Sequence, residues 1–127
     1  MPFVRIDLVR GKSAQYRKTV GEIVYQAMRD TINVPENDKF QVITEHAAEE
    51  LNVADNYMDN HYSKDIILIQ VTMSFGRTVE QRKALFKRIV DDLQAQLGVR
   101  PDDVMMNLVE TAKENWSFGN GIAQYAV

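Results

Sequence analysis

Apolar and polar side chains alternate over residues 3–9, which predicts a β-strand that buries one face. Ser13 then stands where a helix N-cap is expected. From residue 14 to about 31, apolar side chains recur every three or four positions: Val20, Ile23, Val24, Ala27 and Met28. This spacing predicts an amphipathic helix, which Pro35 prevents from continuing. A second strand is predicted over about residues 39–45.

The second half of the chain repeats this order of elements. Residues 66–73 predict a strand that is more continuously apolar, hence more deeply buried. Thr78 and Gln81 have the spacing of a helix capping box. A helix is predicted over residues 79–97, with an apolar face formed by Leu85, Ile89, Leu93 and Leu97. A last strand is predicted over about residues 103–110.

A constant offset of 65 positions (for example 76 − 11 = 65) relates the two halves, through Gly11 and Gly76, Ser13 and Thr78, Val34 and Val99, and Asp38 and Asp103. This indicates a tandem βαβ duplication in which the two strands of each unit are parallel. The predicted fold class is α+β (α/β), a four-stranded mixed sheet with two helices on one face. We expect a single domain over residues 1–127, with βαβ units over about 2–46 and 65–110, a linker over about 47–64 and a C-terminal segment over 111–127.

Helices on one face leave the other face of the sheet without cover. The apolar run over residues 66–71 is unlike a sheet that faces water on that side. We therefore expect the chain to form a homo-oligomer that covers this face. The C-terminal stretch Trp116-Ser117-Phe118-Gly119-Asn120-Gly121 resembles neither a helix nor a plain strand.

Composition and charge narrow the function. The chain of 127 residues suits one domain, and the absence of cysteine excludes disulfides, thiolate metal sites and cysteine nucleophiles. Fifteen basic against 18 acidic residues give a formal net charge of −3, which argues against nucleic acid or an anionic membrane as a partner. No apolar run is long enough for a membrane span, so we expect a cytoplasmic protein.

The residues that most resemble a metal-binding set are Glu45, His46, Glu49 and Glu50. They lack a further ligand at a recognisable spacing, so we interpret them as a solvated turn and expect neither a metal nor a cofactor.

Pro2 is the unusual candidate for chemistry. Removal of Met1 leaves a free prolyl amine, and an α-amino group ordinarily titrates near pH 8. Such an amine acts as a general base when neutral, and it polarises a carbonyl or donates a proton when protonated. Taken alone, however, Pro2 is more simply interpreted as the first residue of a strand, where proline costs no ladder hydrogen bond.

The chain resembles the tautomerase superfamily, and within it the malonate semialdehyde decarboxylase-like branch, over essentially its whole length. Besides Pro2 and the duplication, the motifs that carry the resemblance are Val34-Pro35-Glu36-Asn37-Asp38, Arg77-Thr78-Val79-Glu80-Gln81, Pro101-Asp102-Asp103-Val104 and Trp116-Ser117-Phe118-Gly119. The resemblance implies a homotrimer with pockets at or near the subunit boundaries. It also implies that Pro2 is the catalytic amine and Asp38 the carboxylate near it. Arg77 is then the catalytic cation that binds the substrate carboxylate, in a substrate pocket formed by Phe75, Trp116 and Phe118.

Two reactions of a small oxo acid fit such a site. Protonated Pro2 suits decarboxylation of a 3-oxo acid like malonate semialdehyde, and neutral Pro2 suits keto–enol tautomerisation of a 2-oxo acid such as phenylpyruvate. The best-known decarboxylases carry two arginines around this turn, whereas Phe75-Gly76-Arg77 retains one, which leaves the substrate open. The alternative is a non-enzymatic trimeric binding protein on the same scaffold, and retention of Met1 would favour it.

Overall fold

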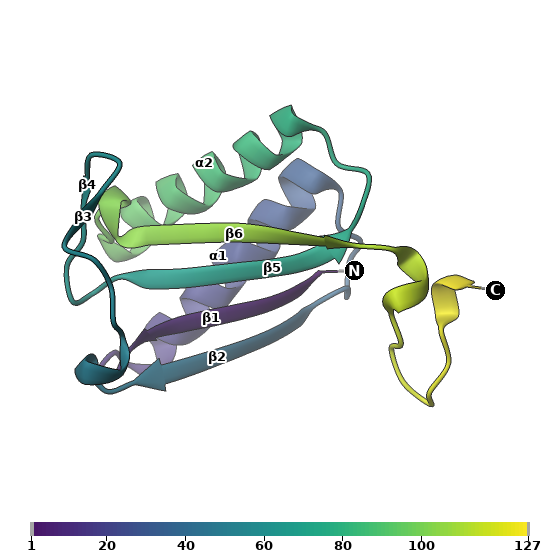
Figure 1. Ribbon diagram of the computed structural model, residues 1–127, viewed down its shortest axis with the longest axis horizontal. Coiled ribbons are helices and arrows are strands. Elements are labelled where there is room, and N and C mark those ends of the chain that lie inside the picture. Colours follow the sequence, from purple (N-terminus) through teal and green to yellow (C-terminus); the bar gives the residue numbers. More distant parts are fainter. Residues whose placement is uncertain (1, 127) are drawn as a thin grey trace.

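Two βαβ units form the fold, as the computed structural model shows for the described residues 2–126 (Figure 1). The strands of the main sheet follow the order β2-β1-β5-β6. They span Phe3–Val9 (β1), Phe40–His46 (β2), Ile67–Ser74 (β5) and Val104–Thr111 (β6). Strand β1 is parallel to β2 and β5 is parallel to β6, whereas β1 and β5 are antiparallel. The prediction of a four-stranded mixed sheet is therefore confirmed.

Helices α1 (Ala14–Ile32) and α2 (Val79–Leu97) pack side by side on one face of this sheet (Figure 1). Alternate residues of the strands point toward them, so the alternation of the sequence becomes alternation of burial. The resulting core is almost wholly apolar, and its largest fully buried side chains include Ile6, Leu8, Met28, Ile69, Leu85 and Leu93. Each such side chain contributes about 1.5–3 kcal/mol through its removal from water.

The duplication predicted from the offset of 65 positions is visible in the backbone. Ser13 and Thr78 both cap a helix, accepting hydrogen bonds from Tyr16 N and Gln81 N. Gly11 and Gly76 both precede these caps with positive φ, at 113° and 126°. Asn33 and Gly98 end the two helices in the left-handed conformation. The same N-cap, the same preceding glycine conformation and the same left-handed C-cap thus occur in both units.

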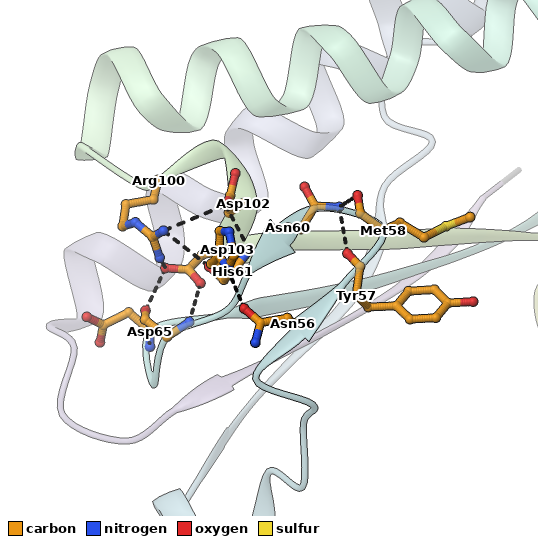
Figure 2. Close-up of polar contacts among 10 residues, drawn as sticks. Asn56, Tyr57, Met58, Asn60, His61, Asp65, Arg100, Asp102 and Asp103 are labelled. Atoms are coloured by element: carbon orange, nitrogen blue, oxygen red, sulfur yellow. Dashed lines mark hydrogen bonds and ion pairs between the residues drawn. The ribbon is translucent and has the colours of Figure 1, made fainter.

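The buried carboxylate of Asp103 holds the connection between the units through hydrogen bonds (Figure 2). A small hairpin of β3 (Asn56–Tyr57) and β4 (Asn60–His61) is followed by Ser63, whose backbone N–H and hydroxyl donate to Asp103 at 2.7 and 2.6 Å. Arg100 donates to the same carboxylate at 3.1 Å, and Asp103 is only 1% exposed. The 3₁₀ turn η2 (Pro101–Asp103) delays the start of β6 to residue 104, one residue later than predicted.

The open face of the sheet carries both apolar and polar side chains. Its exposed apolar residues come from β1, β2 and β6: Phe3, Phe40, Val42, Met105 and Val109. Strand β5 buries Ile67, Ile69 and Val71 against the helices and turns Gln70 outward, so much of its apolar run belongs to the core. Among residues 2–126, no helix is both long and apolar enough to cross a membrane.

The chain after β6 forms irregular structure with two short 3₁₀ turns, η3 (Lys113–Asn115) and η4 (Gln124–Ala126). In Figure 1 this C-terminal segment extends beyond the end of the sheet at which β1 begins.

Candidate active site

The register of the sheet gathers most of the predicted site residues at one end. Phe3, the first residue of β1, is paired with Phe40 at the start of β2 and with Thr72 near the end of β5. Ser74 at the end of β5 is in turn paired with Thr111, the last residue of β6. Pro2, the loop that carries Asp38, the turn that carries Arg77 and the C-terminal segment therefore all adjoin this end (Figure 1).

Pro2 is buried and directly precedes β1. Met1, whose removal the predicted role of Pro2 requires, lies outside the described residues. Asp38 is half-buried and ends a tight turn, in which its N–H donates to the carbonyl of Pro35 at 3.3 Å. Asn37 takes the left-handed position of that turn, with φ 67°, and its N–H donates to the Tyr25 hydroxyl at 3.0 Å. This anchored turn fixes Asp38 two residues ahead of β2, on the side where β1 begins.

Arg77 is held by backbone carbonyls. Its Nε and Nη2 donate to the carbonyl of Ile32 at 3.4 and 3.3 Å, and its Nη1 donates to the carbonyl of Ser74 at 3.3 Å. The guanidinium thereby joins the C-terminus of α1 to the end of β5. At a helix C-terminus the last carbonyls lack partners within the helix, so Arg77 supplies a donor that Ile32 would otherwise lack. No carboxylate of residues 2–126 forms an ion pair with it. Because a guanidinium has five N–H donors, donors remain for a substrate carboxylate.

An aromatic hollow of about 440 Å³ opens at the same end of the molecule. Its lining residues are Phe3, Phe40, Asn115, Trp116, Ser117 and Phe118. The rings of Trp116 and Phe118 are parallel within 4° at a centroid separation of 5.7 Å, and Phe40 lies 5.7 Å from Phe118 on another side. Trp116 Nε1 donates to Thr111 Oγ1 at 2.9 Å, which fixes the indole relative to the end of β6.

The hollow therefore includes two of the three residues predicted as pocket walls. Trp116 and Phe118 line it, whereas Phe75 does not: Phe75 is 62% exposed, and its backbone N–H donates to the carbonyl of Thr111. Pro2, Asp38 and Arg77 adjoin the same end of the sheet but are not lining residues of this hollow.

Sequence reasoning missed Phe3 and Phe40 as wall residues. Their place in the alternation assigns both to the open face, which is a real signal only because the two exposed rings lie on paired positions and form a patch. What the sequence lacked was the register that pairs Phe3 with Phe40 in neighbouring parallel strands.

The acidic turn interpreted as solvated has partners of other kinds. Glu45 forms an ion pair with Arg17 at 3.2 Å, His46 is bonded to Asp7 at 2.7 Å, and Glu50 accepts from the backbone N–H of Ala47. Within residues 2–126, no three His, Asp or Glu side chains are grouped so that they could hold a metal ion.

Comparisons with known proteins agree with one another. Residues 38–119 match the model of a family described as tautomerase enzyme, and residues 2–60 match a second model of the same description. The probable tautomerase YusQ of Bacillus subtilis (strain 168) is 40% identical over 124 residues, which cover 98% of each chain. The probable tautomerase YrdN of the same organism is 26% identical and covers 98% of this chain and 96% of its own.

Solved structures give the same picture. Malonate semialdehyde decarboxylase superposes with a TM-score of 0.91 at 30% identity, covering 98% of this chain and 95% of its own. A second one, FG41 malonate semialdehyde decarboxylase inhibited by 3-bromopropiolate, gives 0.91 at 32% identity and covers 98% and 94%. A symmetric trimer of fused 4-OT shares the fold, with a TM-score of 0.80 at 23% identity over 98% of both chains.

Proposed function

The chain belongs to the tautomerase family, and from that premise we propose that Pro2, freed by removal of Met1, is the catalytic amine for a reaction of a small oxo acid. The observation that carries the proposal is the meeting of four features at one end of the sheet. These are the buried Pro2 directly before β1, the turn with Asp38, the guanidinium of Arg77 and the aromatic hollow. A base, a cation for a carboxylate and apolar walls that exclude water are the parts such a reaction needs.

Tautomerisation uses the neutral amine. The Pro2 nitrogen removes the proton from the enol oxygen of a 2-oxo acid, and the resulting ammonium returns a proton to the neighbouring carbon. The C=C double bond becomes a single bond as the C=O bond forms, so atoms and charge balance. Arg77 binds the carboxylate with the donors that Ile32 and Ser74 leave unused, and so orients the substrate.

Decarboxylation uses the protonated amine. The ammonium of Pro2 polarises the carbonyl of a 3-oxo acid while Arg77 holds the carboxylate. The bond between the carboxylate and the α-carbon breaks, its electron pair enters the enolate, and CO₂ leaves. The positive charge of Pro2 stabilises the enolate, which is then protonated on carbon. Because the two reactions need opposite protonation states of one amine, the direction of the pH–rate profile separates them.

We further propose that the active unit is a homotrimer. The open face carries Phe3, Phe40, Val42, Met105 and Val109 exposed, and a fused 4-OT of the same fold is a symmetric trimer. Light scattering at micromolar concentration tests this, and a monomeric mass would remove the proposal.

Selective alkylation tests the role of Pro2. With 3-bromopyruvate, the amine displaces bromide: a C–N bond forms, the C–Br bond breaks, and a proton passes to solvent. The chain has no cysteine to compete, and lysine amines, with an ordinary pKa near 10.4, are mostly protonated at neutral pH. Peptide mapping after one equivalent of reagent should find the adduct on Pro2, with loss of activity in proportion.

Bromoacetone is the matched control reagent, because it has the same leaving group and no carboxylate for Arg77 to bind. It should label Pro2 more slowly than 3-bromopyruvate does. Labelling spread over lysines, or an adduct on Pro2 that leaves activity intact, would contradict the proposed role of Pro2.

A further inference from the structure

The position of the aromatic wall depends on a segment that the sheet does not hold. Residues 112–126 form no strand, and most of them are exposed. Two contacts join this segment to the sheet at the hollow: the hydrogen bond from Trp116 Nε1 to Thr111 Oγ1 and the packing of Phe118 on Phe40 at 5.7 Å. Contacts within the segment must therefore contribute to holding the wall in place.

The side chain of Gln124 supplies such contacts. Its Oε1 accepts a hydrogen bond from the backbone N–H of Phe118 at 2.9 Å, and its Nε2 donates to the carbonyl of Gly119 at 3.2 Å. One amide thus closes the loop over residues 118–124 through an acceptor and a donor together. The loop between these points takes the left-handed conformation at Asn120 and Gly121, with φ of 58° and 67°. This reversal brings Gln124 back beside Phe118.

The residue held by this bond is the centre of the wall. Phe118 stacks on Trp116, contacts Phe40, and meets the edge of Tyr125 at 5.2 Å and 81°. Tyr125 follows Gln124 directly, so the same closure also places the Tyr125 ring. Loss of the closure frees Phe118 and Tyr125 together, whereas Pro2, Asp38 and Arg77 belong to other segments.

We propose that Gln124 is a positioning residue that holds Phe118 in the wall, with Tyr125 packed against it from outside the hollow, and that this wall selects carboxylic acids with a flat apolar substituent. The proposal rests on the proposed function for its substrate, an oxo acid whose carboxylate binds Arg77. An aromatic ring stacked against Trp116 and Phe118 gains apolar burial and ring–ring contact that a short acid lacks. The site thus favours aryl-substituted oxo acids over those with three carbons.

Binding of non-reacting acids tests the inference without turnover. The probes are 3-phenylpropanoate and propanoate, which share a carboxylate and differ by the ring. The variant is Gln124→Met, which keeps the length of the side chain and removes both hydrogen bonds. Gln15→Met is the matched control, because Gln15 is exposed and its amide donates to Thr19 within α1. Gln15 lies in the first turn of α1, after the end of β1, whereas the hollow lies where β1 begins. Trp116 is the single tryptophan, so its fluorescence reports on the wall alone.

The wild-type protein should bind 3-phenylpropanoate at least about tenfold more tightly than propanoate, with a change in Trp116 fluorescence. Gln124→Met should reduce that preference about three- to tenfold, leave propanoate binding unchanged and increase acrylamide quenching of Trp116. Gln124→Glu, which retains the acceptor for Phe118 N–H and loses the donor, should fall between. Gln15→Met should match the wild type in every readout.

Equal binding of the two acids by the wild type, or an unchanged preference in Gln124→Met, would overturn the inference. These outcomes are distinct from failure of the proposed function. If the wild type discriminates as described but exchanges no C3 proton of any 2-oxo acid for deuterium and decarboxylates no 3-oxo acid, the wall stands and the catalytic role of Pro2 falls. If the wild type turns over an oxo acid but does not discriminate between the two probes, the proposed function stands and the selectivity of the wall falls.

Discussion

Replacement of Arg77 separates a structural role from a substrate-binding role in one residue. Arg77→Met keeps the apolar stem of the side chain and removes the donors to the carbonyls of Ile32 and Ser74. Hydrogen bonds from charged donors contribute about 1.5–3 kcal/mol each at best. The three here are long, at 3.3–3.4 Å, and Arg77 is half-exposed, so we expect a loss of about 1–3 kcal/mol in the free energy of unfolding.

The catalytic loss should be larger. If the remaining donors bind a substrate carboxylate, Arg77→Met removes about 2–4 kcal/mol of transition-state stabilisation, which corresponds to about 30- to 1000-fold in kcat/KM. Most of the change should be a rise in KM, because the carboxylate is bound in both the ground state and the transition state.

Lys12→Met is the matched control. Lys12 occupies the position of Arg77 in the first βαβ unit (77 − 65 = 12), and its Nζ forms an ion pair with Asp65 at 3.1 Å at the opposite end of the sheet. Urea unfolding followed by Trp116 fluorescence gives the stability of each variant, and initial rates with oxo acids give kcat/KM. Lys12→Met should keep wild-type kcat/KM. If Arg77→Met unfolds earlier yet keeps wild-type kcat/KM toward every accepted oxo acid, Arg77 is a structural bridge and the substrate-binding role is refuted.

Further predictions concern the scaffold. Leu85→Ala, which empties a fully buried position, should lower the free energy of unfolding by about 2–5 kcal/mol in urea titration, whereas a loss near zero would mean that Leu85 is not packed as described. Asp103→Ala leaves the N–H and hydroxyl of Ser63 and the Arg100 guanidinium without their acceptor and should cost about 1–3 kcal/mol, with the hairpin of β3 and β4 exchanging its amides faster. Gly76→Ala forces a side chain into φ 126° and should cost about 1–3 kcal/mol, and wild-type stability would exclude that conformation. Burial raises the pKa of the Tyr16 phenol above 10.0. The neutral phenol therefore contributes fully to the free energy of unfolding below pH 10, and this contribution is lost as the pH rises through the folded-state pKa. Tyr16→Phe should remove that alkaline loss of stability in unfolding experiments at about pH 9 and 11.

The parts of the fold that the sequence predicted are those decided locally. Ser13 and Thr78 cap helices because the hydroxyl of an extended residue directly before a helix reaches the backbone N–H three residues later. The alternation in β1 fixed which side chains enter the core. The strands β2, β5 and β6 begin and end one residue later than predicted, and for β6 the 3₁₀ turn Pro101–Asp103 occupies the first expected position.

The candidate site was predictable only in part, for a physical reason. Pro2, Asp38, Arg77, Trp116 and Phe118 were identified through motifs of the family, and their roles remain predictions. The part played by Phe40 depends on strand register, and that of Gln124 on closure of a loop with left-handed residues. Neither follows from residue type or spacing, because both arise when distant segments meet. Phe75, which the resemblance also implied as a pocket residue, is 62% exposed and does not line the hollow, and its role in substrate binding stays a prediction.

The central claim is that the amine of Pro2 does the chemistry, and one comparison tests it most directly. Protein with Met1 removed and protein with Met1 retained, each verified by intact mass, differ by one residue. In the processed form the free amine is that of Pro2, whereas in the other form it is that of Met1, and residues 2–127 are the same in both. The account predicts turnover of oxo acids by the processed form and a loss of at least about a hundredfold in kcat/KM in the form that keeps Met1, in which the Pro2 nitrogen is an amide. Equal kcat/KM in the two forms would contradict it.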